Sequence, residues 1–192
     1  MTDNAVTLGI LAGGRATRLD GLDKAWLERD GQPQILRIAR RFAGRVDRVL
    51  VSANRNLQRY QQHGLTPIAD SVEDIGPIGG LSALMAAYKT SWLLTIPVDV
   101  VDSNDCLLPT LLANADGQGA YAVDDDGVQP LVALWRVRVA KAVVGEAVAQ
   151  RRYGVHRLLD MLKMSPVVLH GVRFGNLNTP ADLMAAHVVS PP

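Results

Sequence analysis

The chain has 192 residues, a length that suits a single domain with one sizeable core. Its hydrophobic content of 48% and charged content of 20% are typical of a globular protein, and a formal net charge of +1 gives no overall field that would attract nucleic acid or a membrane surface. A single cysteine excludes an internal disulfide and fits a reducing compartment, and the amino-terminal residues show no secretory or membrane-spanning pattern. We expect a cytoplasmic monomer that binds neither nucleic acid nor membranes.

Short apolar runs alternate with helical patterns along the chain, which predicts an α/β fold with a mostly parallel sheet. In chain order, the expected strands cover residues 6–11, 48–52, 65–68, 91–97, 120–123, 131–135 and 167–169. The expected helices begin near Pro33 and then cover residues 57–62, 81–88, 106–113, 139–150 and 155–162. The dipeptide Asp126-Gly127 predicts a hairpin turn, so a short part of the sheet is expected to be antiparallel.

The polar segments between these elements carry further expectations. A loop over residues 70–80 is expected to lead into the helix 81–88 through Gly79 and Gly80, with the free N–H groups of the helix facing a cleft. Cys106 is interpreted as a small core residue, and the three aspartates at 124–126 as a solvated turn. Near the end, Thr179, Pro180 and Asp182 predict an acidic capping box.

The stretch of residues 8–24 is where the sequence first indicates a function. Its apolar run ends at Leu11 and is followed by Ala12-Gly13-Gly14 and then by charged residues that include Arg18 and Lys24. Adjacent glycines let backbone N–H groups approach an anion, and the basic side chains add positive charge beside them. The spacing excludes both a Walker A loop and the dinucleotide fingerprint G-x-G-x-x-G. We interpret the stretch as a phosphate-binding loop of another kind.

Carboxylates and amides are expected to gather at the same edge of the sheet. Asp99 follows a buried strand, Asp70 precedes the Gly76-Pro77 loop, and Asn176 and Asn178 lie near the end of the chain. Mg²⁺ prefers oxygen ligands and usually takes one or two carboxylates together with phosphate oxygens and water. We therefore predict that Asp99 is a metal ligand and that Lys24 stabilises charge on phosphates.

Six motifs follow one another over almost the whole chain. They are Leu11-Ala12-Gly13-Gly14-x-x-x-Arg18-x-x-Gly21-x-Asp23-Lys24, Ala53-Asn54-Arg55, Asp70-Ser71 with Gly76-Pro77 and Gly80-Leu81, Pro97-Val98-Asp99, Gln129-Pro130-Leu131, and Asn176-Leu177-Asn178-Thr179-Pro180. In content and order they resemble the molybdenum cofactor guanylyltransferases, the MobA family of nucleotidyltransferases. The resemblance implies a three-layer, Rossmann-like α/β fold in one domain over residues 1–192, with a nucleotide-binding half before about residue 100 and an acceptor-binding half after it.

The same resemblance implies a Mg²⁺-dependent transfer of GMP from GTP to molybdopterin that bears molybdenum, with release of pyrophosphate. It implies catalytic roles for Lys24, Arg18 and Asp99, with Mg²⁺ on Asp99. The implied nucleotide contacts are Leu11, Ala12, Gly13, Gly14, Lys24, Ser52, Asn54, Asp70, Gly76 and Asp99, and the implied acceptor contacts are Gln129, Pro130, Asn176 and Asn178. Transient contacts with the proteins that insert molybdenum and with the molybdoenzymes that receive the cofactor are implied as well.

Some positions depart from the family pattern and bear on specificity. Ser52 stands where many members have asparagine, and Asp20 adds an acid beside the phosphate-binding loop. The order Leu-Ala-Gly-Gly, in place of the Leu-Ala-Ala-Gly of cytidylyltransferases, favours guanine, and our hypothesis is that Gly13 leaves room for the exocyclic amine of the purine. The sequence leaves open a nucleotidyltransferase for another base or acceptor, such as CTP, a sugar phosphate or phospholactate, and a non-catalytic nucleotide-binding module.

Overall fold

The computed structural model describes residues 5–13, 23–87 and 90–189. Within these ranges the chain forms a seven-stranded sheet in the order β5-β4-β1-β6-β8-β7-β9. Its strands are β1 (Val6–Leu11), β4 (Arg48–Ser52), β5 (Thr66–Ile68), β6 (Trp92–Pro97), β7 (Gly119–Asp124), β8 (Gly127–Arg136) and β9 (Ser165–Val168). Strands β5, β4, β1 and β6 are parallel, whereas β8 is antiparallel to both of its neighbours. The predicted mostly parallel sheet with an antiparallel part is confirmed.

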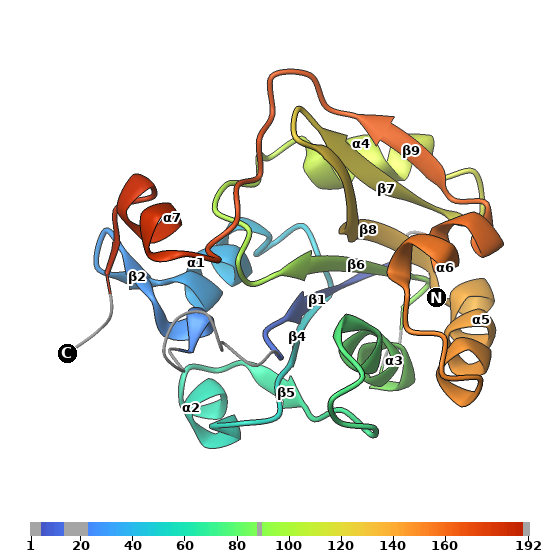
Figure 1. Cartoon of the computed structure of the whole chain (residues 1–192), viewed down its shortest axis with the longest axis horizontal. Helices are drawn as coiled ribbons and strands as arrows, with labels where there is room; N and C mark the ends of the chain where they lie inside the picture. The colour runs from blue at the N-terminus through green and yellow to red at the C-terminus, as the bar shows by residue number, and fades with distance from the viewer. Residues whose placement is uncertain (1–4, 14–22, 88–89, 190–192) are drawn as a thin grey trace.

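Helices cover both faces of this sheet, which gives the expected three layers (Figure 1). The helices are α1 (Gln34–Arg41), α2 (Leu57–Gln62), α3 (Pro77–Ala87), α4 (Leu107–Asn114), α5 (Val137–Ala149), α6 (Val155–Leu162) and α7 (Pro180–Ala185), with a single 3₁₀ turn, η1 (Lys24–Trp26). Helices α3, α5 and α6 pack on one face, and α1 and α4 on the other. In the described part of the chain, every helix is too short or too polar to cross a bilayer.

Strand β1 determines how closely one helical layer approaches the sheet. All six of its residues are buried, as expected for a parallel strand covered on both faces. A Cβ atom at Gly9 would lie 2.7 Å from a methyl carbon of Leu84 in α3, well inside van der Waals contact. Glycine at this position therefore lets α3 lie directly against β1, and the first turn of α3 reaches the carboxyl edge of the sheet.

A second, smaller sheet was not predicted. It contains β10 (Val188–Val189), β2 (Glu28–Arg29) and β3 (Gln32–Pro33), paired in that order, so the expectation that the strand near residue 167 is the last one was wrong. Strands of two residues are too short to show an alternating hydrophobic pattern. This sheet joins the carboxyl-terminal segment to the segment after η1, and Leu27, Leu177 and Val188 form a small core between them.

Three local expectations are corrected by the structure. Helix α3 begins at Pro77 and not at residue 81, because proline suits the first helical turn, so Gly79 and Gly80 lie inside the helix. Cys106 is exposed and precedes α4, whose buried face starts at Leu107. Asp124, expected in a solvated turn, has only 6% of its surface exposed.

The carboxylate of Asp124 is buried because it joins three segments. It accepts hydrogen bonds from the backbone N–H of Phe174 at 2.9 Å, from the side chain of Gln129 at 3.0 Å and from the backbone N–H of Asp126 at 3.0 Å. Burial by itself would raise the pKa of this group, but the hydrogen bonds outweigh it and hold the pKa below the ordinary value of 3.8. Asp124 thus ties the hairpin of β7 and β8 to the carboxyl-terminal chain.

We expect Asp124→Ala to lower the free energy of unfolding at pH 7 by about 1–3 kcal/mol, because it leaves the buried N–H of Phe174 without a partner. Since folding lowers the pKa of this carboxyl, its ionised form stabilises the fold above about pH 4 and that contribution is lost as the pH falls through the folded pKa. Denaturant unfolding at pH 7, 5 and 3 tests this. Asp126→Ala, which removes an exposed ion pair with Arg173, is the control and should change stability by less than about 1 kcal/mol; equal losses in both variants would contradict the prediction.

Candidate active site

A cavity of about 740 Å³ lies at the carboxyl ends of the parallel strands. From β1 the chain runs first to β4 on one side and later to β6 on the other, so the cavity sits where the strand order reverses, the place where open α/β sheets bind ligands. Twelve residues predicted from the sequence line it: Leu11, Ala12, Gly13, Lys24, Ser52, Asn54, Asp70, Gly76, Asp99, Gln129, Pro130 and Asn176. Gly14 and Arg18, also predicted, lie outside the described residues, as does Asp20.

At the β4–β5 end of the cavity, Asp70 is held by two neighbours. The side-chain amide of Asn54 donates to Oδ2 of Asp70 at 3.2 Å and its oxygen accepts from the backbone N–H of Asp70 at 2.8 Å. Ser52 donates to Oδ1 of Asp70 at 3.1 Å. Although Ser52 departs from the family pattern, it is therefore part of the site, and its hydroxyl group fixes the carboxylate of Asp70.

Gly13 and Gly80 both lie close to Ser52, but they differ in whether the protein has room for a larger side chain. A Cβ atom on Gly13 would lie 3.6 Å from Oγ of Ser52 and 3.9 Å from Nδ2 of Asn54, which is ordinary van der Waals contact. On Gly80 it would collide with Oγ of Ser52, so a glycine there is what allows the first turns of α3 to approach the end of β4. The protein itself has room for a methyl group at Gly13 and none at Gly80.

At the β6 end, Lys24 and Asp99 form an ion pair with Nζ and Oδ2 3.3 Å apart, and their side chains are 20% and 24% exposed. Nζ of Lys24 also donates to Oδ1 of Asn178 at 2.6 Å. Asn178, a predicted acceptor contact, does not line the cavity. It contacts Lys24, which does. Asp23, which lines the cavity, caps η1 by accepting from the N–H of Ala25 at 3.1 Å.

An aromatic cluster holds the 3₁₀ turn that carries Lys24. Trp26, two residues after it, packs 5.1 Å from the ring of Tyr60 and 5.0 Å from the ring of His63, and the guanidinium of Arg59 lies 4.1 Å from its centroid. Burial, and then the charge of Asp23, raises the pKa of Tyr60, so its hydroxyl stays neutral. Tyr60 lines the cavity and was not predicted; its place as the single aromatic residue of helix α2 was the available indication.

On the β8 side, Gln129 and Pro130 line the cavity, and Asn176 lines it as well. The amide of Gln129 is oriented by its hydrogen bond to Asp124, and Asn176 pairs with Val100 in an antiparallel bridge. Three of the four predicted acceptor residues are thus brought to the cavity by two segments far apart in the sequence, and Asn178 is the exception.

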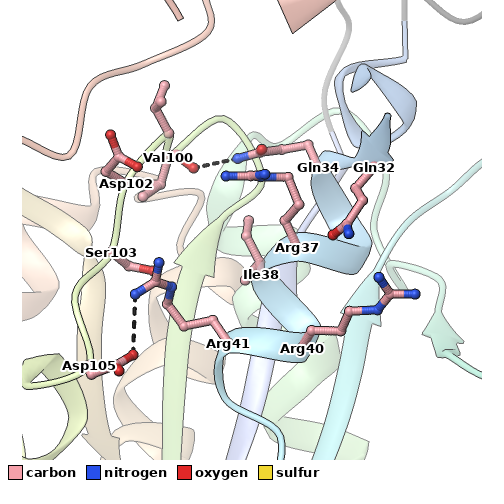
Figure 2. A pocket seen from close by; sticks show the side chains of 11 residues that line it. Gln32, Gln34, Arg37, Ile38, Arg40, Arg41, Val100, Asp102, Ser103 and Asp105 are labelled. Atoms are coloured by element: carbon pink, nitrogen blue, oxygen red, sulfur yellow. Dashed lines mark hydrogen bonds and ion pairs between the residues drawn. The ribbon is translucent and has the colours of Figure 1, made fainter. Parts of the chain in front are cut away.

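A second cavity of about 430 Å³ lies between α1 and residues 100–105. Figure 2 shows Arg41 reaching to Asp105 across this cavity and the buried Gln34 donating to the carbonyl of Val100. Hydrogen bonds and charge from Arg45, followed by Arg41, hold the pKa of Asp105 below its ordinary value of 3.8. These contacts fasten the segment that follows Asp99 to α1, so the metal-ligand candidate stands on a fixed backbone.

Comparison with known proteins identifies the family. The family profile of the MobA-like NTP transferase domain matches residues 8–166. A molybdenum cofactor guanylyltransferase of Yersinia pseudotuberculosis (serotype O:1b, strain IP 31758) is 32% identical over 186 residues, 92% of each chain, and one from Yersinia pestis matches with the same identity and coverage.

Solved structures share the fold at lower identity. Molybdopterin-guanine dinucleotide biosynthesis protein A of Archaeoglobus fulgidus superposes with a TM-score of 0.72 at 19% identity, over 94% of this chain and 96% of that chain. The 4-diphosphocytidyl-2C-methyl-D-erythritol synthase of Anaerococcus prevotii gives a TM-score of 0.70 at 12% identity, over 96% and 95%. On the family profile and the full-length similarity to the guanylyltransferases, the chain belongs to the MobA-like NTP transferase family.

Proposed function

We propose that this protein transfers GMP from GTP to molybdenum-loaded molybdopterin, forming the guanine dinucleotide cofactor and pyrophosphate. One observation carries the proposal: the polar groups of the cavity follow the order of the strands. Asp70 and Asn54 lie at β5 and β4, Lys24 and Asp99 at β6, and Gln129 at β8. Because neighbouring strands are about 4.8 Å apart, this order suits a base, its phosphates and an acceptor laid across the sheet.

The β4–β5 end suits a guanine. The edge of guanine carries N–H donors, and the carboxylate of Asp70, fixed by Ser52 and Asn54, is an acceptor held in one orientation. The exposed backbone of Gly13 borders the same end, so the choice of base can depend on the space above this residue. The curated relatives named as guanylyltransferases support the same assignment.

The transfer needs little proton chemistry from the protein. A phosphate monoester has a second pKa of about 6 and is largely dianionic at neutral pH, so the acceptor is already a nucleophile. Its oxygen forms a bond to the α-phosphorus of GTP while the bond from that phosphorus to the bridging oxygen breaks and pyrophosphate leaves. Lys24 stabilises the charge on the phosphates, and the walls of the cavity hold the two anions in line.

The residues at the β6 end fit a magnesium ion bound together with the nucleotide. Among the described residues no group of three or more acidic, cysteine or histidine side chains forms a complete metal site, and Asp99 is the carboxylate beside Lys24. A single carboxylate with phosphate oxygens and water is the set that Mg²⁺ accepts. Asp99 would hold the ion, and the positive charge of the ion would offset the negative charge of the phosphates.

The reaction itself is tested by incubating the protein with Mg²⁺, molybdenum-loaded molybdopterin and either GTP or CTP. We expect guanine dinucleotide and pyrophosphate with GTP. Product with CTP alone would refute the base assignment, and transfer to a sugar phosphate or to phospholactate in place of molybdopterin would refute the acceptor assignment. Nucleotide binding without turnover on any acceptor would indicate a non-catalytic module.

We expect Asp99→Asn to lower the rate of GMP transfer roughly a hundredfold or more, because it removes the charge that opposes Lys24 and the proposed metal ligand. Initial rates measured over a range of Mg²⁺ concentrations test this. Asp102→Asn is the matched control, since Asp102 lies three residues further along the same segment, is 63% exposed and pairs with Arg29 outside the cavity. Wild-type activity in Asp99→Asn would overturn the assignment of Asp99.

We expect Gly13→Ala to shift the ratio of kcat/KM for GTP over that for CTP toward CTP by about tenfold, since one added methyl group in a fitted pocket changes specificity by that order. The protein accommodates this methyl group without a clash, so a change reflects the ligand. Competition assays with both nucleotides measure the ratio. Gly145→Ala, on the open surface of α5, should leave it unchanged; an unchanged ratio in Gly13→Ala would remove Gly13 from the explanation of base choice.

A further inference from the structure

The carboxyl-terminal segment of residues 176–182 lies against the strand end that holds the proposed catalytic pair. Figure 1 shows this segment, in red, passing the end of β6 before it enters α7. The N–H of Leu177 donates to the carbonyl of Asp99 at 3.0 Å, and Asn178 accepts from Lys24 at 2.6 Å. The position of Lys24 therefore depends on how this segment is held.

Asp182 holds the segment with more hydrogen bonds than a helix cap requires. The capping box accounts for two of them, from the N–H of Thr179 to Oδ2 of Asp182 at 2.7 Å and from the N–H of Asp182 to Oγ1 of Thr179 at 3.2 Å. Oδ2 also accepts from the N–H of Asn178 at 3.0 Å. This third bond fixes the backbone of the residue whose side chain contacts Lys24.

We infer that Asp182 is a positioning residue for Lys24, acting through Asn178, and that its capping of α7 is the smaller part of its role. The inference rests on the proposed function for its effect on catalysis, but the contact that it describes is a property of the fold. Asp182 does not line the cavity and makes no described hydrogen bond to Lys24, so the backbone of Asn178 is its contact route to the lysine, beside the longer-range attraction between the two charges.

The balance around Lys24 shows why such positioning matters. Its ammonium group has three N–H donors, and among the described residues two of them have acceptors, Oδ1 of Asn178 and Oδ2 of Asp99. Within the described residues the third donor has no acceptor, and in the proposed reaction it serves a phosphate oxygen. If Asn178 were displaced, the lysine would be free to close on Asp99, where it would compete with a metal ion for the carboxylate.

The charge of Asp182 is maintained under working conditions. Its pKa is lowered below the ordinary value of 3.8 by the hydrogen bond to Thr179, by the N–H groups of Asn178 and Thr179, and by the nearby charge of Lys24. The carboxylate is therefore ionised throughout the neutral range. Helix α7 has no buried residues, so a substitution at Asp182 leaves the main core intact.

The test compares three full-length variants. Asp182→Ala removes all the bonds of the carboxylate. Thr179→Ala removes the cap of α7 but keeps the bond from Asn178 to Asp182, and Asp182→Glu keeps the charge and an acceptor long enough to reach the same N–H groups. We measure kcat and KM for GTP, thermal unfolding, and the rate at which acetic anhydride modifies Lys24, read by peptide mass spectrometry.

We expect Asp182→Ala to lower kcat on the order of tenfold, as small displacements of catalytic groups do, and to change the modification rate of Lys24 at least threefold. Thr179→Ala should lower the unfolding temperature of the protein about as much as Asp182→Ala does, while kcat and the modification rate of Lys24 stay within twofold of wild type. Asp182→Glu should keep both kcat and the modification rate near their wild-type values. Equal effects of Asp182→Ala and Thr179→Ala on kcat and on modification, or wild-type values in Asp182→Ala, would overturn the inference. Absence of GMP transfer in the wild type, with the modification pattern as expected, would refute the proposed function and leave the positioning role supported.

Discussion

The ion pair between Lys24 and Asp99 is the interaction on which the arrangement of the site depends. Lys24 comes from the 3₁₀ turn after the glycine-rich stretch and Asp99 from the end of the central strand β6, and their charged atoms are 3.3 Å apart. Two opposite charges this close together at the edge of a cavity offset one another. In the function that we propose, each takes a partner of opposite sign, Lys24 a phosphate of the nucleotide and Asp99 the metal ion. The rest of the structure keeps both groups at that edge.

Separate sets of contacts hold each member of the pair. Trp26, packed between Tyr60, His63 and Arg59, anchors the turn that carries Lys24. The segment after Asp99 is fastened to α1 by Gln34 and by the pair of Arg41 with Asp105, and to the residues after α1 by Arg45. The hydrogen bond from Leu177 to Asp99 joins it to the carboxyl-terminal chain. Preorganised charges of this kind need no rearrangement when a substrate arrives, which is why such sites stabilise charge more effectively than water does.

The fold and much of the cavity followed from local patterns. Apolar runs identified the parallel strands to within a residue or two, since a strand buried on both faces is apolar throughout, and acids placed after such strands were expected at one edge of the sheet. Asp70 and Asp99 were found at the cavity for that reason, whereas Gln129 was expected there only from the resemblance to the guanylyltransferases. The small sheet of β2, β3 and β10 and the true start of α3 at Pro77 were missed, because two-residue strands have no period and a proline after glycine is equally typical of a loop.

By itself, the sequence determined the α/β class, the strand ends that meet at the site, and the residue types that phosphate and metal chemistry require. Only the tertiary structure decided which of those residues touch one another. It buried Asp124 beside Phe174, placed Asn178 behind Lys24, and gave Asp182 a bond to Asn178 beyond its cap. Such contacts join residues up to 154 positions apart. They depend on packing between distant segments, whereas a periodic pattern reports only on the neighbours of a residue along the chain.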